Sequence, residues 1–178
     1  MRVIITGPVL IAALAATACR EAPTSPRALS VNTSAATDRS TGDTPNYNLE
    51  VILRPVGSGD GFGHVKFRQP GNDAAHIVFL DVWVRDLAPN TEYLLQRAVD
   101  RTLNGICPNT NATMWLTLGK GLVPQSITTD EKGTGREDLF RILTAAPGTT
   151  FDIFFRVVRK DNMTVAVLTS ECYQFSIK

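Results

Sequence analysis

The sequence is poor in the residues from which metal sites and thiol-based catalytic sites are built. It contains two histidines and three cysteines, namely His64, His76, Cys19, Cys107 and Cys172. A zinc or copper site needs three or four convergent ligands, and no H-x-H pair is present. His76 falls at the start of an apolar strand face, which favours a strand-end histidine. We therefore predict no metal centre and no cofactor.

The motifs that identify common enzyme classes are also missing. There is no G-x-S-x-G nucleophile elbow. The stretch GSGDGFGH at 57–64 is neither a P-loop nor a dinucleotide fingerprint, and no helix pattern follows it. Acidic side chains lie beside predicted turns, and nothing in the sequence pairs two of them as a glycosidase would require. These acidic residues are Asp81, Asp86, Asp130, Glu131, Glu137 and Asp138.

Charge of one sign is not in excess. The formal net charge is +1 at pH 7, and residues 47–178 hold 14 Lys and Arg against 14 Asp and Glu. Nucleic-acid binding depends on surplus basic residues, and so does attachment to an anionic membrane surface. The balance predicts no nucleic-acid partner and argues against a polybasic membrane contact.

No apolar run is long enough to span a bilayer as a helix, which takes about 20 residues. The uncharged run from Val3 to Ala18 has 16 residues, follows a single positive residue, Arg2, and ends in small residues. This order of charge, apolar core and small residues is that of a secretory signal. We predict that residues 1–18 are a signal peptide.

The end of this run, Ala16-Thr17-Ala18 before Cys19, resembles the lipobox of bacterial lipoproteins. In that family the signal is cut before the cysteine, which then carries a diacylglyceryl group and usually an acylated amine. The position of Ala16 is more often Leu in the family. The resemblance implies a membrane anchor at Cys19, and Arg20 in place of Asp implies the outer membrane. The same residues also fit an ordinary signal-peptidase site, which would make the protein secreted or periplasmic.

The number of cysteines supports the anchor. An export signal implies an oxidising compartment, where we expect Cys107 and Cys172 to form a disulfide. Cys19 is then left over from this pairing, and lipidation of its thiol would account for its presence. Two or more acyl chains hold a protein stably at a membrane, whereas one holds it marginally.

We expect the lipidated N-terminus and its linker to occupy residues 19–46. Residues 20–46 contain nine Ser or Thr and three Pro among 27, with few large apolar side chains. Such a segment cannot bury enough surface to offset the entropy of ordering its backbone, so we predict a disordered tether. A flexible chain of this length has a root-mean-square span of roughly 30 Å.

Residues 47–178 form a single predicted domain of β-strands. Apolar and polar residues alternate with a period of two, and Gly-, Pro-, Asn- and Asp-rich turns separate the strands. Strands at this spacing point to an antiparallel sandwich or barrel. Long strands are expected at 47–55, 76–86, 150–160 and 163–178, and shorter ones at 63–67, 113–118 and 125–129.

The two faces of the longest strands differ in their expected surroundings. In 76–86 the second face is partly apolar, because it carries Phe79 and Trp83, so we expect this strand to be covered on both sides. Trp83 and Trp115 could stack on sugars or line a peptide groove, although half-buried sheet positions are the simpler interpretation. In 150–160 we expect Asp152 and Arg156 to face outward.

Two segments carry helix formers with an i, i+4 apolar pattern. They are 92–105 and 136–146. We interpret the first as a strand because of the turn motif that precedes it. The second stays undecided between helix and strand, and the surrounding pattern favours a strand.

That motif, Leu87-x-Pro89-x-Thr91-x-Tyr93, resembles the corner of fibronectin type III and related immunoglobulin-like sandwiches. There the leucine packs inward, the proline fixes the corner, and the tyrosine hydroxyl bonds the backbone a few residues upstream. The resemblance implies an antiparallel β-sandwich with an immunoglobulin-like Greek key. About 79 residues follow Val99, more than a fibronectin module would have.

Two functions are consistent with these features. The first is a non-catalytic lipoprotein of the cell envelope whose domain binds a protein or glycan or serves structurally. The alternative is a hydrolase or metal-dependent enzyme whose site is assembled from loops.

Mass spectrometry of the mature N-terminus tests the anchor. We expect the first residue to be Cys19, carrying a diacylglyceryl group on its thiol. An unmodified Cys19, or a disulfide from Cys19 to another cysteine, would contradict the assignment of the three cysteines.

Overall fold

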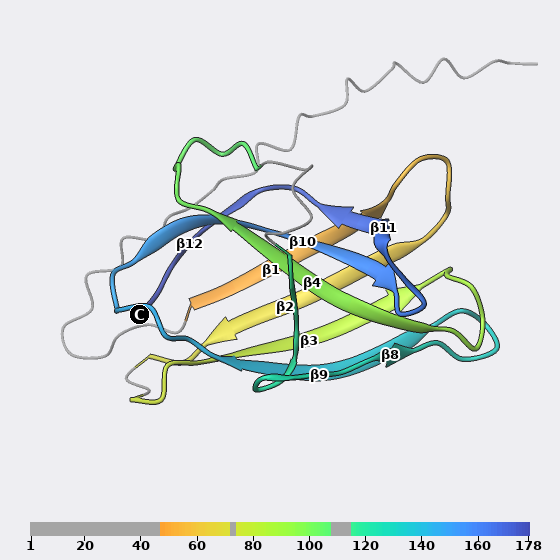
Figure 1. The fold of residues 1–178 in the computed structure, drawn as a ribbon, viewed down its shortest axis with the longest axis horizontal. Coiled ribbons are helices and arrows are strands. Elements are labelled where there is room, and N and C mark those ends of the chain that lie inside the picture. The colour runs from red at the N-terminus through yellow and green to blue at the C-terminus, as the bar shows by residue number, and fades with distance from the viewer. Residues whose placement is uncertain (1–46, 72–73, 108–114) are drawn as a thin grey trace, which may run out of the picture. The chain divides into compact units, whose positions relative to one another are not determined.

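All regular secondary structure in the described residues is β-strand. The structure is a computed structural model and describes residues 47–71, 74–107 and 115–178 (Figure 1). The strands are β1 (Tyr47–Pro55), β2 (Phe62–Gln69), β3 (Ile77–Arg85), β4 (Glu92–Asp100), β5 (Leu116–Thr117), β6 (Gly119–Lys120), β7 (Val123–Pro124), β8 (Ile127–Thr128), β9 (Gly135–Ile142), β10 (Thr150–Arg159), β11 (Asn162–Ser170) and β12 (Tyr173–Ser176).

The predicted all-β fold class is confirmed. Both ambiguous segments form strands, β4 and β9. Among the residues described, none belongs to a helix with the length and hydrophobicity needed to cross a membrane. The predicted signal peptide at 1–18, Cys19 and the linker at 19–46 lie outside the described residues.

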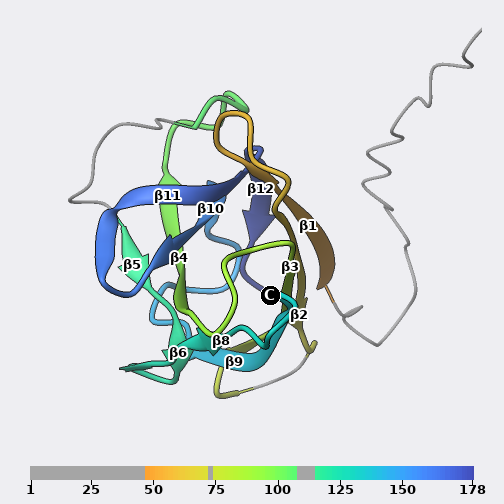
Figure 2. The ribbon, with the colours of Figure 1, turned by 90° about the vertical axis from the view of Figure 1, so that its right-hand side faces the viewer.

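The strands form one sheet that nearly closes on itself. Its order is β5-β4-β10-β11-β1-β2-β3-β9-β6-β7, with β12 also paired to β10 and β8 to β4. Figure 2 shows the strands arranged around a ring, with β6 and β8 beside β9. The pairing is mixed, because β6 runs parallel to β9 while the other pairs are antiparallel. The immunoglobulin-like sandwich is therefore not confirmed; the arrangement is barrel-like.

A single short segment brings the two ends of the sheet together. Leu118 donates its amide to the Leu95 carbonyl of β4, and Gly121 donates its amide to the Phe140 carbonyl of β9. The turn between them is tight, because a Cβ on Gly119 would lie 1.8 Å from the Val123 carbonyl oxygen. In a sandwich these outer strands would be separate edges, whereas here one segment hydrogen-bonds to both.

The interior of the ring is filled by apolar side chains from all the long strands. Val51, Val65 and Phe155 are fully excluded from water. The ring of Phe67 packs edge-on against Phe155 and Phe175, with centroids 6.2 and 4.7 Å apart. Burial of such side chains contributes about 1.5–3 kcal/mol each, so this cluster is the main source of stability.

The covered faces of the sheet differ from the expectation. Phe79 and Trp83 of β3 are 37% and 38% exposed, so the prediction that this strand is covered on both sides is wrong. The strand covered on both sides is β10, whose Asp152 and Arg156 lie on the face opposite the core, as expected, but are buried there. The alternating pattern identified the strand, but it could not show which outer face another segment would cover.

Residues 101–107 and 115–117 make contacts with the outer face of β10. The Asp152 carboxylate accepts hydrogen bonds from the amides of Asn104 and Gly105, at 3.1 and 2.8 Å. Arg156 donates to Gln96 at 2.8 Å, and its guanidinium carbon lies 4.2 Å from the centroid of the Trp115 ring. These bonds satisfy polar groups whose burial would otherwise be costly.

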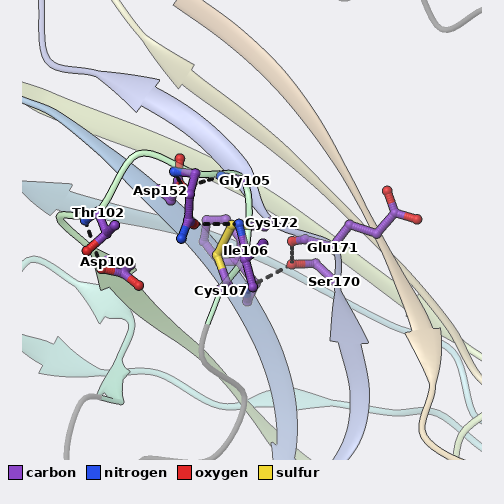
Figure 3. The surroundings of a disulfide bond; sticks show 11 residues. Asp100, Thr102, Gly105, Ile106, Cys107, Asp152, Ser170, Glu171 and Cys172 are labelled. Carbon is purple, nitrogen blue, oxygen red and sulfur yellow. Dashed lines mark hydrogen bonds between the residues drawn. A yellow bond between two sulfur atoms is a disulfide. The ribbon is translucent and has the colours of Figure 1, made fainter.

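A disulfide fastens this cover to the last two strands. Cys107 and Cys172 are bonded, with Cα atoms 5.4 Å apart and a sequence separation of 65 (Figure 3). Cys172 lies between β11 and β12, and Asp152 lies close to the bridge (Figure 3). The predicted pairing of the two domain cysteines is confirmed.

The corner before β4 has the local geometry of the motif although the sheet order differs. Tyr93 is 2% exposed, and its hydroxyl accepts a hydrogen bond from the Ala88 amide at 3.1 Å. Leu87, before Pro89, is partly buried, and its amide donates to the Gly133 carbonyl. Gly133 has φ +74°, and a Cβ there would lie 2.1 Å from the Leu87 carbonyl oxygen. The corner is therefore held by the turn that precedes β9.

Substitution of Cys172 by serine tests the contribution of the disulfide. Closing a loop of 65 residues stabilises the native state by about 4 kcal/mol in the loop-entropy model. We expect Cys172→Ser to lower the melting temperature by roughly 10 °C in thermal unfolding followed by circular dichroism. A reductant should lower the wild-type value similarly and leave the variant unchanged. Two reactive thiols within the oxidised native domain would contradict the bridge.

Candidate functional site

The sheet fails to close along part of one edge. On β4, the last residue paired with β5 is Arg97, which lies opposite Leu116. On β9, the residue paired with β6 is Phe140, opposite Lys120. Past these residues, no described strand bridges β4 and β9, and we call this gap the seam.

A hollow of about 400 Å³ opens at the seam. We call it the seam pocket. Its lining comes from the end of β4, the end of β9, the loop that follows β9, the start of β10 and the C-terminus: Arg97, Val99, Arg101, Arg141, Ile142, Leu143, Thr144, Ala145, Thr149, Thr150, Phe151 and Ile177.

The pocket is lined by arginines without acidic partners. Arg97, Arg101 and Arg141 line it, and none of the lining residues is acidic. In the part of the chain that the structure describes, none of the three forms an ion pair. Glu137, four residues before Arg141 on β9, binds Lys120 instead, at 2.8 Å. The positive charge of the pocket is therefore not neutralised by any side chain that the structure describes.

The effect of this unpaired positive charge is seen most clearly in the pKa of Arg97. Its backbone position lies in the same row as Tyr93 and Leu95, whose side chains belong to the core. Burial lowers the pKa of Arg97, and repulsion by Arg141 lowers that pKa further. Both effects disfavour the charged guanidinium, so an anion placed beside it would relieve an existing electrostatic cost.

The second arginine is held in position by the backbone. The guanidinium of Arg141 donates to the Gly121 carbonyl at 3.2 Å. Gly121 in turn donates its amide to Phe140, the residue before Arg141. The segment that closes the sheet therefore also orients Arg141. The other N–H donors of the Arg141 guanidinium form no hydrogen bond with any residue that the structure describes.

The remaining wall is apolar or carries hydroxyl groups. Val99, Leu143, Phe151 and Ile177 are packed against the core on one side. The loop after β9 is fixed by two backbone bonds, from Leu143 to the His76 carbonyl and from Gly148 to the Ile177 carbonyl. The pocket is thus preformed, with a size and an apolar lining typical of small-molecule sites.

Five of the six acidic residues considered from the sequence have partners outside the seam pocket, and the sixth, Glu131, is exposed. Asp81 binds Arg136 through both carboxylate oxygens, at 3.1 and 2.9 Å. Asp130 accepts the amides of Lys132 and Thr134, and these hydrogen bonds lower its pKa. Asp86, Glu137 and Asp138 lie within ion-pair distance of Arg85, Lys120 and Arg136 respectively.

The two histidines do not form part of a cluster of metal ligands. His64 Nε2 lies 3.7 Å from a carboxylate oxygen of Glu50. His76 precedes β3 in a left-handed conformation, with φ 49°. Within residues 47–71, 74–107 and 115–178, no three His, Cys, Asp or Glu side chains gather as metal ligands would.

The outer face of β2, β3 and β9 has a second hollow, of about 450 Å³. Its aromatic lining residue, Phe79, is already in contact with a cation, because the guanidinium carbon of Arg68 lies 5.2 Å from the centroid of the ring. Its lining carries charges of both signs, and Asp81 and Asp138 lie within ion-pair distance of Arg136. The seam pocket differs because none of its lining residues is acidic.

Sequence reasoning missed the arginines of the seam pocket. A signal for Arg97 was present, since it falls in register with Tyr93, Leu95 and Val99, a row that is otherwise apolar. A charged residue at an inward position is costly and needs a reason. No such signal existed for Arg141, because whether 136–146 is helix or strand was undecided.

Substitution of Arg97 by methionine should stabilise the ligand-free domain, because it removes an uncompensated, partly buried charge and keeps a long side chain. We expect the free energy of unfolding to rise by roughly 0.5–2 kcal/mol in a denaturant titration. The matched control is Arg54→Met, at an exposed position of β1, which should change stability by less than about 0.5 kcal/mol. A fall in stability of Arg97→Met would show that a partner in the protein neutralises this charge.

The geometry of the chain itself is the basis for assigning a function. Comparison with family models, with curated proteins and with solved structures found no match.

Proposed function

We propose that the protein is a non-catalytic binding protein of the cell envelope, anchored by lipid at Cys19, whose domain binds an anionic ligand in the seam pocket. The observation that carries this proposal is the convergence of Arg97 and Arg141 in a preformed pocket without an acidic lining residue. The ligand supplies the negative charge that the residues lining the pocket lack.

The chemistry of the two side chains fits this role. A guanidinium presents parallel N–H donors in a planar fork, which match the two oxygens of a carboxylate or phosphate group. Such charge-assisted hydrogen bonds are stronger in a partly buried site, where water screens them less. Pairing with an anion also removes the mutual repulsion between Arg97 and Arg141.

Export and anchoring are supported by separate features. The Cys107–Cys172 disulfide is typical of proteins that mature in an oxidising compartment. The lipobox-like Ala16-Thr17-Ala18-Cys19 and the predicted linker at 19–46 would place the domain on a tether at the membrane. The outer membrane is the proposed location, because Arg20 follows the cysteine.

Isothermal titration calorimetry with two anions tests the binding function. We use the full chain with Cys19→Ala, so that neither lipid nor detergent competes for the pocket. The probes are octanoate and inorganic phosphate, and we expect at least one to bind with a dissociation constant of about 1 mM or tighter. Arg97→Met and Arg141→Met should each weaken that binding by about tenfold or more, equivalent to ~1.4 kcal/mol.

Arg54→Met is the matched control and should bind the probe as the parent chain does. Failure of both probes to bind, or equal binding by the Arg97 and Arg141 variants, would overturn the proposed function. Loss of binding by Arg97→Met in a domain that is more stable than the parent would separate a binding defect from a folding defect.

A further inference from the structure

The seam pocket has two chemically different sides. Arg97 and Arg141 contribute guanidinium groups from β4 and β9. Val99, Leu143 and Phe151 contribute apolar surface that continues into the core. A ligand that matches both sides has a charged head and an apolar body.

From this arrangement we infer that the ligand is a carboxylate that carries a short or medium apolar chain. This inference rests on the proposed function and specifies the ligand for the same pocket. The carboxylate head lies between Arg97 and Arg141, and the chain lies against Val99 and Phe151 along the seam.

The limited number of positive groups favours a singly charged head. Two of the three lining arginines, Arg97 and Arg141, are partly buried, and the third, Arg101, is exposed after the end of β4. The lining contains no lysine, and the described residues provide no helix N-terminus that would add amide donors for a phosphate. A multiply charged anion would have to lose more hydration than these groups replace.

The filled interior limits the length of the chain. Phe155 lies opposite Arg97 in the β4–β10 ladder, Leu95 and Val157 form the next pair on the same face, and all three are fully buried. The chain therefore lies within the hollow rather than passing into the centre of the sheet. A volume of about 400 Å³ is near the lower end of the range for ligand sites, which favours a short or medium chain over a long-chain lipid.

A homologous series of ligands tests this inference. Acetate, hexanoate, octanoate, 1-octanol and inorganic phosphate are titrated into the Cys19→Ala chain by calorimetry. We expect affinity to rise by up to about fourfold for each added methylene until the hollow is filled, since ~0.8 kcal/mol per buried CH₂ corresponds to that factor. Octanoate should bind at least about tenfold more tightly than 1-octanol, because the alcohol cannot pair with the arginines.

Val99→Thr tests the contact with the apolar chain of the ligand separately from the contact with its carboxylate. It keeps the shape of the side chain but places a hydroxyl in the apolar wall. We expect it to weaken octanoate binding severalfold and to leave phosphate binding unchanged. Arg97→Met should weaken octanoate strongly and leave 1-octanol unchanged.

The outcomes separate this inference from the proposed function. If phosphate and acetate bind as tightly as octanoate, the inference that the ligand carries an apolar chain is overturned, while the proposed anion-binding function stands. Octanol binding as tightly as octanoate would overturn the carboxylate head and the role of the arginines. No binding by any of the five probes would overturn both.

Discussion

The backbone pairing of residues 118–121 with both β4 and β9 is the constraint on which the rest of the domain depends. Five strands, β10, β11, β1, β2 and β3, separate β4 from β9 in the sheet order, and this short segment joins the two strands on the other side. Gly119 makes that reach possible, because the Val123 carbonyl occupies the space of its missing side chain. With the turn in place, apolar side chains from all the long strands face one interior and exclude water.

The same constraint creates the pocket. The bridging turn is short, so it pairs with β4 and β9 over few residues and leaves the ends of both strands apart. Backbone groups along such an opening would be exposed to water in any case, which makes it a place where charged side chains can be tolerated. Arg97 and Arg141 lie there, one from each side. Incomplete closure and the proposed ligand recognition are in this sense two results of one short connection.

The strands could be predicted from the sequence because their period of two is local. Residues 47–55, 76–86 and 150–160 each show it within nine to eleven residues, and each forms a strand. The closure could not be predicted, because β5 to β8 have two residues each and so show no period. The corner at Leu87 to Tyr93 did not indicate the topology, for a related reason. Its hydrogen bond joins residues five apart in the sequence and carries no information on which distant strands pair.

The burial of β10 shows the same limit. Asp152 and Arg156 alternate with apolar residues as an outward face would, yet a segment some 50 residues earlier in the chain covers them. Their partners are amides of a loop, a glutamine and a tryptophan ring, none of which has a spacing that identifies it in advance. The candidate site depends on such non-local neighbours even more, since it takes one arginine from each of two strands that are not hydrogen-bonded to each other.

The position of β1 has a mechanical consequence. This strand, the first after the linker, lies between β2 and β11 in the middle of the sheet order. A pulling force transmitted along the linker would reach the domain at Tyr47, whose partner in the ladder is Gln69 of β2. The load would act first on the ladder of seven residue pairs that joins β1 to β2, because β1 pairs with β11 only at its far end, over Leu53, Arg54 and Pro55. A pull on the proposed anchor would therefore load the β1–β2 ladder before it reaches the pairing with β11.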